Sequence, residues 1–210
     1  MNLTPKILCG SPINMIKQYC IDDFFENIKK FTYTNLDFYF VDNSLDKNWH
    51  SEISKKYAVE IGYVNPINKR NCDYMCESSN KLRQRAIESG YQYFFYLECD
   101  LFPHKTIIED LLIWKQDFVS APYFISESYK SELCRSEIDL TSKYLLNRNV
   151  STIEGFRDFN GTLKRLDGTG TGCSLISEKL FNMIPFRTIS NSPNHADTFF
   201  HQDMVAHGFR

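Results

Sequence analysis

The chain has 210 residues, 42% of them hydrophobic, and a formal net charge of −2 at pH 7. This length is enough for one core with an inserted segment. Acidic and basic residues are mixed along the chain, which argues against a nucleic-acid-binding surface or a polybasic membrane patch. No apolar run approaches the roughly 20 residues of a membrane span, and the opening MNLTPKILCG lacks the long apolar core of a signal peptide.

The seven cysteines are an odd number and are mostly scattered, and Cys72 and Cys76 lie too far apart in sequence for a zinc-type pair. We therefore predict reduced thiols and a cytoplasmic protein. The triplets at Asn149 and Asn160 have the form of N-glycosylation acceptors, but they carry no meaning in a protein that is not secreted.

In chain order, the pattern predicts strands alternating with helices. A strand at 6–10 precedes a helix that Asn14 caps and whose apolar residues recur every fourth position from Ile16 to Ile28. Gly90 is expected to stop a later helix. The further predicted elements are a strand at 36–41, a strand at 57–64, a helix at 77–89, a strand at 91–97, a helix at 106–115 and a strand at 117–124.

This alternation predicts an α/β fold, with a Rossmann-like, mostly parallel central sheet and helices on both faces. Central strands of such sheets are continuously apolar, as YFFYL at 93–97 is. Ligands of these folds bind at the carboxyl ends of the strands. Glu98 and Asp100, which follow this strand, are therefore predicted to lie at a ligand site.

Glu98 and Asp100 are two residues apart, so we expect an extended backbone to point both side chains the same way. Two close carboxylates repel each other and raise each other's pKa unless a cation lies between them. Mg²⁺ or Mn²⁺ suits this place, because these ions prefer oxygen ligands and leave positions open for phosphate. The alternative is a solvated strand end that binds nothing.

Four segments, in order, resemble glycosyltransferases of the GT-A fold, in the broad family-2-like group. The one at 80–112 carries an acid-x-Asp motif between an apolar strand and a proline-bearing turn. The four segments are FYFVDNSLD at 38–46, NKLRQRAIESGYQYFFYLECDLFPHKTIIEDLL at 80–112, GTGCSLISEKLFNMIPF at 170–186 and DTFFHQDMVAHGF at 197–209.

The resemblance implies a single GT-A domain over residues 1–210. Its nucleotide-binding half is residues 1–125 and its acceptor-side half is residues 166–210. Between them lies a polar, tyrosine-bearing insertion at 126–165, for which the sequence indicates no binding partner. In the family, the chain continues past the Gly-aromatic pair, here at 208–209, into a strand and often a metal-binding His, so we expect the acceptor-side half to be incomplete.

The resemblance also implies a metal-dependent transfer of a sugar from a nucleotide-sugar donor to a hydroxyl acceptor, with Mn²⁺ or Mg²⁺ as cofactor. The acceptor, whether a glycan, a lipid-linked sugar or a protein, is not determined by the sequence. A catalytically inactive nucleotide-binding module of the same fold is the alternative, but it has no need of acids at all of Glu98, Asp100 and Asp197. A sugar-nucleotide pyrophosphorylase is disfavoured, because LCGSPINMIKQ replaces its glycine-rich loop and following Arg.

On the donor side, the resemblance makes Asp100 a direct metal ligand. It places Glu98, where the family usually has Asp, near the ribose or a metal-bound water. Asp42 matches the residue that reads the base, where an acceptor oxygen favours uridine or guanosine over adenosine, and the resemblance favours UDP. A turn-forming role is the alternative for Asp42. The loop expected to wrap the nucleoside contains Gly10, Ser11 and Pro12.

On the acceptor side, the small residues of LDGTGTGC at 166–173 would let a sugar lie close against the backbone. We predict sugar contacts at Thr169, Gly170 and Thr171. The alternative is a strained loop that enters a strand.

An inverting transfer needs one carboxylate to take the proton of the acceptor hydroxyl. The resemblance places Asp197 in this role, at the start of the last helix, where the helix dipole favours its charge. Asp203 is the runner-up. His201 follows Asp197 by four residues on the same helix face, which leaves open a metal pair or a solvated or locally bonded histidine.

Overall fold

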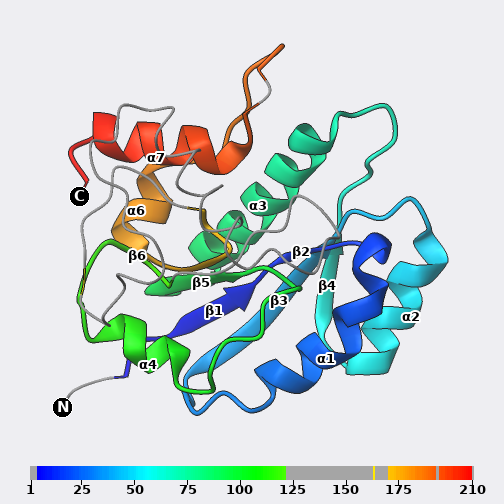
Figure 1. Cartoon of the computed structure of the whole chain (residues 1–210), viewed down its shortest axis with the longest axis horizontal. Helices are drawn as coiled ribbons and strands as arrows, with labels where there is room; N and C mark the ends of the chain where they lie inside the picture. Colours follow the sequence, from blue (N-terminus) through cyan, green and yellow to red (C-terminus); the bar gives the residue numbers. More distant parts are fainter. Residues whose placement is uncertain (1–3, 122–162, 164–169, 193, 210) are drawn as a thin grey trace, which may run out of the picture.

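A computed structural model of the chain describes residues 4–121, 163, 170–192 and 194–209 (Figure 1). Apart from residue 163, the predicted insertion at 126–165 lies outside the described residues, together with Thr169. The two triplets at Asn149 and Asn160 are outside them as well.

In the described part of the chain, the strands form a single sheet in the order β2-β3-β1-β5-β7-β6, with β4 beside β3. The pairs among the first five strands are parallel, whereas β7 is antiparallel to both β5 and β6. The mostly parallel sheet is thus confirmed. The strands are β1 (Ile7–Gly10), β2 (Pro12–Ile13), β3 (Leu36–Asp42), β4 (Glu60–Tyr63), β5 (Tyr93–Leu97), β6 (Phe118–Ser120) and β7 (Cys173–Ser177).

Helices cover both faces of this sheet (Figure 1). On one face α1, α2 and α4 share a core, and on the other face α3, α6 and α7 share a second one. None of the described helices is long and apolar enough to cross a membrane. The helices are η1 (Met15–Lys17), α1 (Gln18–Ile28), α2 (Lys47–Tyr57), α3 (Asn71–Glu88), α4 (Ile107–Leu112), α6 (Glu178–Met183) and α7 (Ala196–Ala206).

The two cores follow from the alternation of side chains along each strand. In β3, Phe40 enters the core under α1 and α2, whereas Tyr39 and Val41 enter the core under α3. In β5, Phe95 and Phe94 divide in the same way. Because both faces are buried, the central strands read as continuous apolar runs.

The register of the parallel strands aligns their carboxyl ends. Cys9 of β1 pairs with Phe38 of β3 and with Phe95 of β5, so the three strands run together toward one edge of the sheet. The segments that leave β2, β3 and β5 consequently emerge near one another, although they are far apart in the sequence.

One helix was missing from the sequence prediction. Residues 47–57 form α2, which Asp46 caps by accepting a hydrogen bond of 2.8 Å from the Asn48 N–H. The helix ends at Ala58, which adopts a left-handed conformation with φ of 52°. Of its residues only Trp49 and Ile53 are buried, and two apolar positions are too few to give a helical period.

Other predicted bounds differ from the structure. Helix α3 begins at Asn71, before the predicted 77. Of the residues that the prediction missed, 71–76, only Cys76 is buried, so they show no apolar period. The strand predicted at 57–64 shortens to β4, because α2 extends to Tyr57. Ile16, expected in the buried stripe of the first helix, lies in η1 and is 77% exposed. Gly90 does follow the end of α3, with φ of 66°.

The segment after β5 is a turn. The strand ends at Leu97, and the Leu101 N–H donates a hydrogen bond of 3.1 Å to the Glu98 carbonyl. The expectation that Glu98 and Asp100 share an extended backbone is therefore wrong. Cys99 between them is 4% exposed and belongs to the core under α1.

Gly10, the last residue of β1, lies in close contact with β3 and α3. A Cβ atom built at this position would lie 2.6 Å from the Tyr39 carbonyl oxygen of the neighbouring strand and 2.8 Å from Leu82 of α3. The first contact is with backbone, which cannot rotate away. The glycine is thus required by packing, whatever its relation to a ligand.

We predict that Gly10→Ala lowers the free energy of unfolding by about 1–3 kcal/mol, the usual cost of overpacking a core. Urea unfolding followed by circular dichroism measures this change. Ser51→Ala, at an exposed position of α2, is the control and should stay within about 0.5 kcal/mol of the parent. Equal stability of Gly10→Ala and the parent would contradict the packing argument.

Candidate functional site

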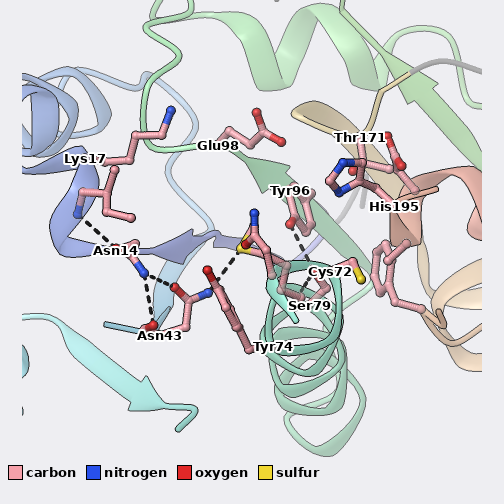
Figure 2. Close-up of a pocket in the computed structure, with 16 residues that line it drawn as sticks. Asn14, Lys17, Asn43, Cys72, Tyr74, Ser79, Tyr96, Glu98, Thr171 and His195 are labelled. Atoms are coloured by element: carbon pink, nitrogen blue, oxygen red, sulfur yellow. Dashed lines mark hydrogen bonds between the residues drawn. The ribbon is translucent and has the colours of Figure 1, made fainter. Parts of the chain in front are cut away.

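A cavity of about 350 Å³ opens beyond the carboxyl ends of β2, β3 and β5 (Figure 2). Its volume is within the range of roughly 300–1,000 Å³ that is usual for small-molecule sites. The lining residues come from seven separate segments of the chain. They are Asn14, Ile16, Lys17, Asn43, Asn71, Cys72, Tyr74, Met75, Ser79, Tyr96, Glu98, Thr171, Phe186, His195, Ala196 and Asp197.

Acidic groups gather on one side of this cavity. Glu98 from the turn after β5 and Asp197 from the first turn of α7 both line it. Burial raises the pKa of the Glu98 carboxyl to about 7, with further contributions from the charges of Asp100 and Asp197, against the opposing effect of Lys17. Asp100 and Asp197 are therefore each close enough to Glu98 to repel its charge.

Lys17 supplies a positive charge to this group. Its ammonium, at the end of η1, forms an ion pair with the Asp100 carboxylate. Partial burial opposes the charge on the amine, but the hydrogen bond and the charge of Asp100 outweigh it and raise the pKa of Lys17. Figure 2 shows the Lys17 ammonium and the Glu98 carboxylate on the same side of the cavity.

Two asparagines join the loops that follow β2 and β3. The Asn14 amide donates hydrogen bonds to the backbone carbonyl of Asn43, at 3.0 Å, and to its side-chain oxygen, at 2.7 Å. The Asn43 amide in turn donates to Ser78 of α3, at 3.1 Å. Asn14 also caps η1 by accepting from the Ile16 N–H. The polar wall of the cavity is thus held by its own hydrogen bonds.

Helix α3 holds the opposite, more aromatic wall. The Ser79 and Tyr96 hydroxyls share a hydrogen bond of 3.1 Å beneath the cavity. Asn80 pairs through its amide with the backbone of Phe186, donating to the carbonyl at 2.7 Å and accepting from the N–H at 3.0 Å. The loop that carries Phe186 is thereby fixed against α3.

The expected nucleoside loop is buried. Gly10, Ser11 and Pro12 lie in the core, and the Ser11 hydroxyl donates to the Pro12 carbonyl at 2.8 Å. The cavity is lined instead by the residues that follow, Asn14 and Lys17.

Asp42, the expected base-reading residue, is fully buried at the end of β3. One of its oxygens accepts a hydrogen bond of 2.8 Å from the Ser44 N–H, and the other lies 3.4 Å from the His50 ring nitrogen. Burial raises the pKa of Asp42, and the contacts with Ser44 and His50 oppose this rise. It is the next residue, Asn43, that lines the cavity.

Among the expected sugar contacts, Thr171 lines the cavity and is 6% exposed. Gly170 precedes it, and its carbonyl accepts a hydrogen bond of 3.3 Å from the Ser120 hydroxyl. Figure 2 shows Thr171 beside His195 on the side of the cavity away from Lys17.

The two candidate bases of α7 have different surroundings. Asp197 lines the cavity, and one of its oxygens accepts a hydrogen bond of 2.6 Å from the Thr198 N–H. Asp203 forms two hydrogen bonds with the Arg187 guanidinium, at 2.6 and 2.8 Å, which lower the pKa of its carboxyl. His201 packs edge-on against Phe118 at 4.9 Å and is buried, so a solvated side chain is excluded for this residue, whereas a locally bonded one is not.

Sequence reasoning missed most of the neutral lining residues. Asn43 had a detectable signal, because it follows an apolar strand just as Glu98 does. Lys17 and His195 had no such signal. Lys17 lies beyond β2, a strand that the sequence did not predict, and His195 precedes α7 but does not cap it through its side chain.

Oxygen ligands for a divalent cation are present at this site. Glu98 and Asp100 are hard carboxylates, and burial, together with the charges of Asp100 and Asp197, raises the pKa of Glu98, so a bound cation would favour its ionised form. In the part of the chain that the structure describes, no group of three or more His, Cys, Asp or Glu side chains could hold a metal ion. The donor set thus fits Mg²⁺ or Mn²⁺ only with phosphate or water completing the coordination.

Comparisons with known proteins agree with this fold. No protein-family model and no curated protein sequence matches the chain. A mannosyltransferase from Pyrobaculum calidifontis, solved with GDP-Man and Mn²⁺, superposes with a TM-score of 0.64 at 12% identity, over 100% of this chain and 54% of its own. Glucosyl-3-phosphoglycerate synthase from Mycobacterium tuberculosis superposes with a TM-score of 0.59 at 13% identity, over 97% of this chain and 66% of its own.

TarS from S. aureus also matches, with a TM-score of 0.55 at 13% identity, over 93% of this chain and 32% of its own. The chain thus spans between a third and two thirds of the length of these proteins. Identities this low show the fold alone, and they confirm the predicted GT-A fold.

We predict that Glu98 makes stability fall as pH rises. The carboxyl ionises near its ordinary pKa of 4.5 in the unfolded chain but near 7 in the folded one, so the folded state holds the extra proton between these values. In EDTA, the parent should therefore lose stability relative to Glu98→Gln from pH 4.5 to 7, by on the order of 3 kcal/mol.

Urea unfolding at a series of pH values measures this difference. Glu52→Gln, at an exposed position of α2, controls for the general effect of replacing a glutamate and should follow the parent. Parallel pH profiles for the parent and Glu98→Gln would show that the cavity does not perturb this carboxyl.

Proposed function

We propose that this protein is a metal-dependent glycosyltransferase that moves a sugar from a nucleotide-sugar donor to a hydroxyl acceptor. The observation that carries the proposal is that Glu98 and Asp197 line one cavity beyond the carboxyl ends of parallel strands, with Asp100 close enough to Glu98 to raise its pKa. Such edges bind nucleotides in open α/β sheets. The shared fold with glycosyltransferases supports the same conclusion.

In this proposal the donor's diphosphate lies at the acidic side of the cavity. Asp100 and Glu98 hold Mg²⁺ or Mn²⁺, which when bound neutralises charge that builds on the departing diphosphate. Asn14 and Asn43 form the wall toward the nucleoside. We propose a uridine donor, in line with the sequence resemblance; one compared structure is of a glucosyl-3-phosphoglycerate synthase in complex with UDP.

Asp197 is the proposed base of an inverting transfer. It lines the cavity together with Glu98, whose pKa its charge helps to raise. From there it can take the proton of an acceptor hydroxyl as the new bond forms. Asp203 suits this role less, because its hydrogen bonds with Arg187 lower its affinity for a proton.

We predict that UDP with Mn²⁺ stabilises the protein and that Asp100→Asn removes most of this effect. A ligand at 100 times its Kd adds about 2.7 kcal/mol to the free energy of unfolding. Thermal unfolding with and without UDP and Mn²⁺ measures it, and GDP and ADP test the choice of base. Asp110→Asn, an exposed aspartate of α4, is the matched control. Equal shifts in the parent and Asp100→Asn would exclude Asp100 as a ligand.

We predict that Asp197→Asn reduces the transfer rate by about 10²–10⁴-fold, the usual contribution of a general base. Donor affinity should change little, because the base contacts the acceptor. The matched comparison is Asp203→Asn, which should retain the rate. Release of UDP from candidate nucleotide sugars measures turnover, and titration calorimetry measures binding.

Two results would contradict this assignment. If Asp203→Asn is inactive while Asp197→Asn is as active as the parent, Asp203 is the base. If the parent and both variants bind the donor equally and none turns it over, the protein is a nucleotide-binding module without this activity.

A further inference from the structure

The ion pair between Lys17 and Asp100 brings together two segments that are 83 residues apart in sequence. The side chains of Lys17 and Asp100 are 38% and 29% exposed. Ion pairs of this exposure contribute little to stability, because water screens them. The fold therefore does not depend on this contact, although the contact lies at the edge of the cavity.

The side chains around the cavity carry more negative than positive charge, which disfavours an anionic ligand. Glu98 and Asp197 line it, and Asp100 adjoins it. Lys17 is the single lysine or arginine among the described lining residues. A diphosphate brought here would meet three carboxylates, so it needs positive charge both from a divalent cation and from the protein.

The backbone of Lys17 is held by hydrogen bonds, whereas its side chain is held at its far end by the ion pair with Asp100. The Lys17 N–H donates to the Asn14 carbonyl at 2.8 Å, and the Lys17 carbonyl accepts from the Cys20 thiol at 3.3 Å. Asn14 is itself joined to Asn43 by two hydrogen bonds. The ammonium can therefore change its partner by rotation about the bonds of its four-carbon stem, with no movement of the chain.

We infer that Lys17 is an exchangeable cation of the donor site: it neutralises Asp100 while no ligand is bound, and it turns to the diphosphate of the donor when a divalent cation takes its place on Asp100. This inference rests on the proposed function. It adds that the metal and the lysine compete for one carboxylate and then act together on one anion.

The inference predicts opposite effects of one substitution on two ligands. In Lys17→Met, Mn²⁺ alone should bind more tightly than to the parent, because no ammonium competes for Asp100. With Mn²⁺ present, UDP should bind about 10- to 100-fold more weakly, the range expected for one hydrogen bond to a charged group. Uridine, which has no phosphate, should bind equally to both proteins.

Electron paramagnetic resonance of free Mn²⁺ measures the first affinity, and titration calorimetry with UDP and uridine measures the others. Lys29→Met is the matched control, because Lys29, which follows α1, forms an exposed ion pair with Glu26 at 2.6 Å. It should leave all three affinities unchanged. Lys17→Arg retains the charge and should recover most of the UDP affinity. Circular dichroism checks that each variant is folded.

Several outcomes would overturn the inference. If Lys17→Met binds UDP as the parent does, Lys17 does not contact the diphosphate. If Lys17→Met binds Mn²⁺ no more tightly than the parent, the lysine and the metal do not compete. In both cases the proposed function stands, provided that the parent binds UDP with Mn²⁺. If the parent binds neither UDP nor GDP in the presence of Mn²⁺, the proposed function and the inference fall together.

Discussion

Repulsion among carboxylates at one edge of the sheet is the interaction on which the character of this site depends. Glu98, Asp100 and Asp197 converge beyond β5, where burial weakens the screening by water. The protein meets this repulsion in two ways, with a raised pKa at Glu98, so that it binds a proton more readily, and an ammonium held at Asp100. Both are replaceable, which is what a site for a cation and an anion together requires.

Side chains of α3 hold in place the loops that form the cavity. Ser78 fixes Asn43 and so the loop after β3, whereas Asn80 fixes the backbone of Phe186 and so the loop before α7. Arg83 adds hydrogen bonds to the carbonyls at the end of α6. Polar side chains on a partly buried helix are costly unless they are paired, and here each pairing positions one wall of the cavity.

The sequence predicted elements well where one pattern was strong. Continuous apolar runs indicated β3 and β5, and Gly90 indicated the end of α3. The prediction failed where burial involved few or polar residues. Helix α2 buries only two of its side chains, and the first turns of α3 bury serine and cysteine, so neither shows an apolar period.

The sequence likewise indicated only some of the residues that line the cavity. Glu98 and Asp100 could be chosen because a buried strand directly precedes them, and this relation is local. The same local rule misjudged the backbone there, because a turn begins where the strand's hydrogen bonding ends. The family resemblance implied Gly10 and Asp42 as nucleotide contacts, and the structure buries both in the core.

The sequence by itself determined the alternation of strands and helices, the parallel sheet that follows from it, and the two acids at the end of its central strand. Only the tertiary structure decided that Lys17 meets Asp100, that Asn43 rather than Asp42 reaches the cavity, and that Asp197 lies near Glu98. The physical reason is the separation in sequence between the residues concerned. A periodic pattern records which face of an element is buried, whereas contacts between distant segments depend on strand order and register, which no local pattern contains.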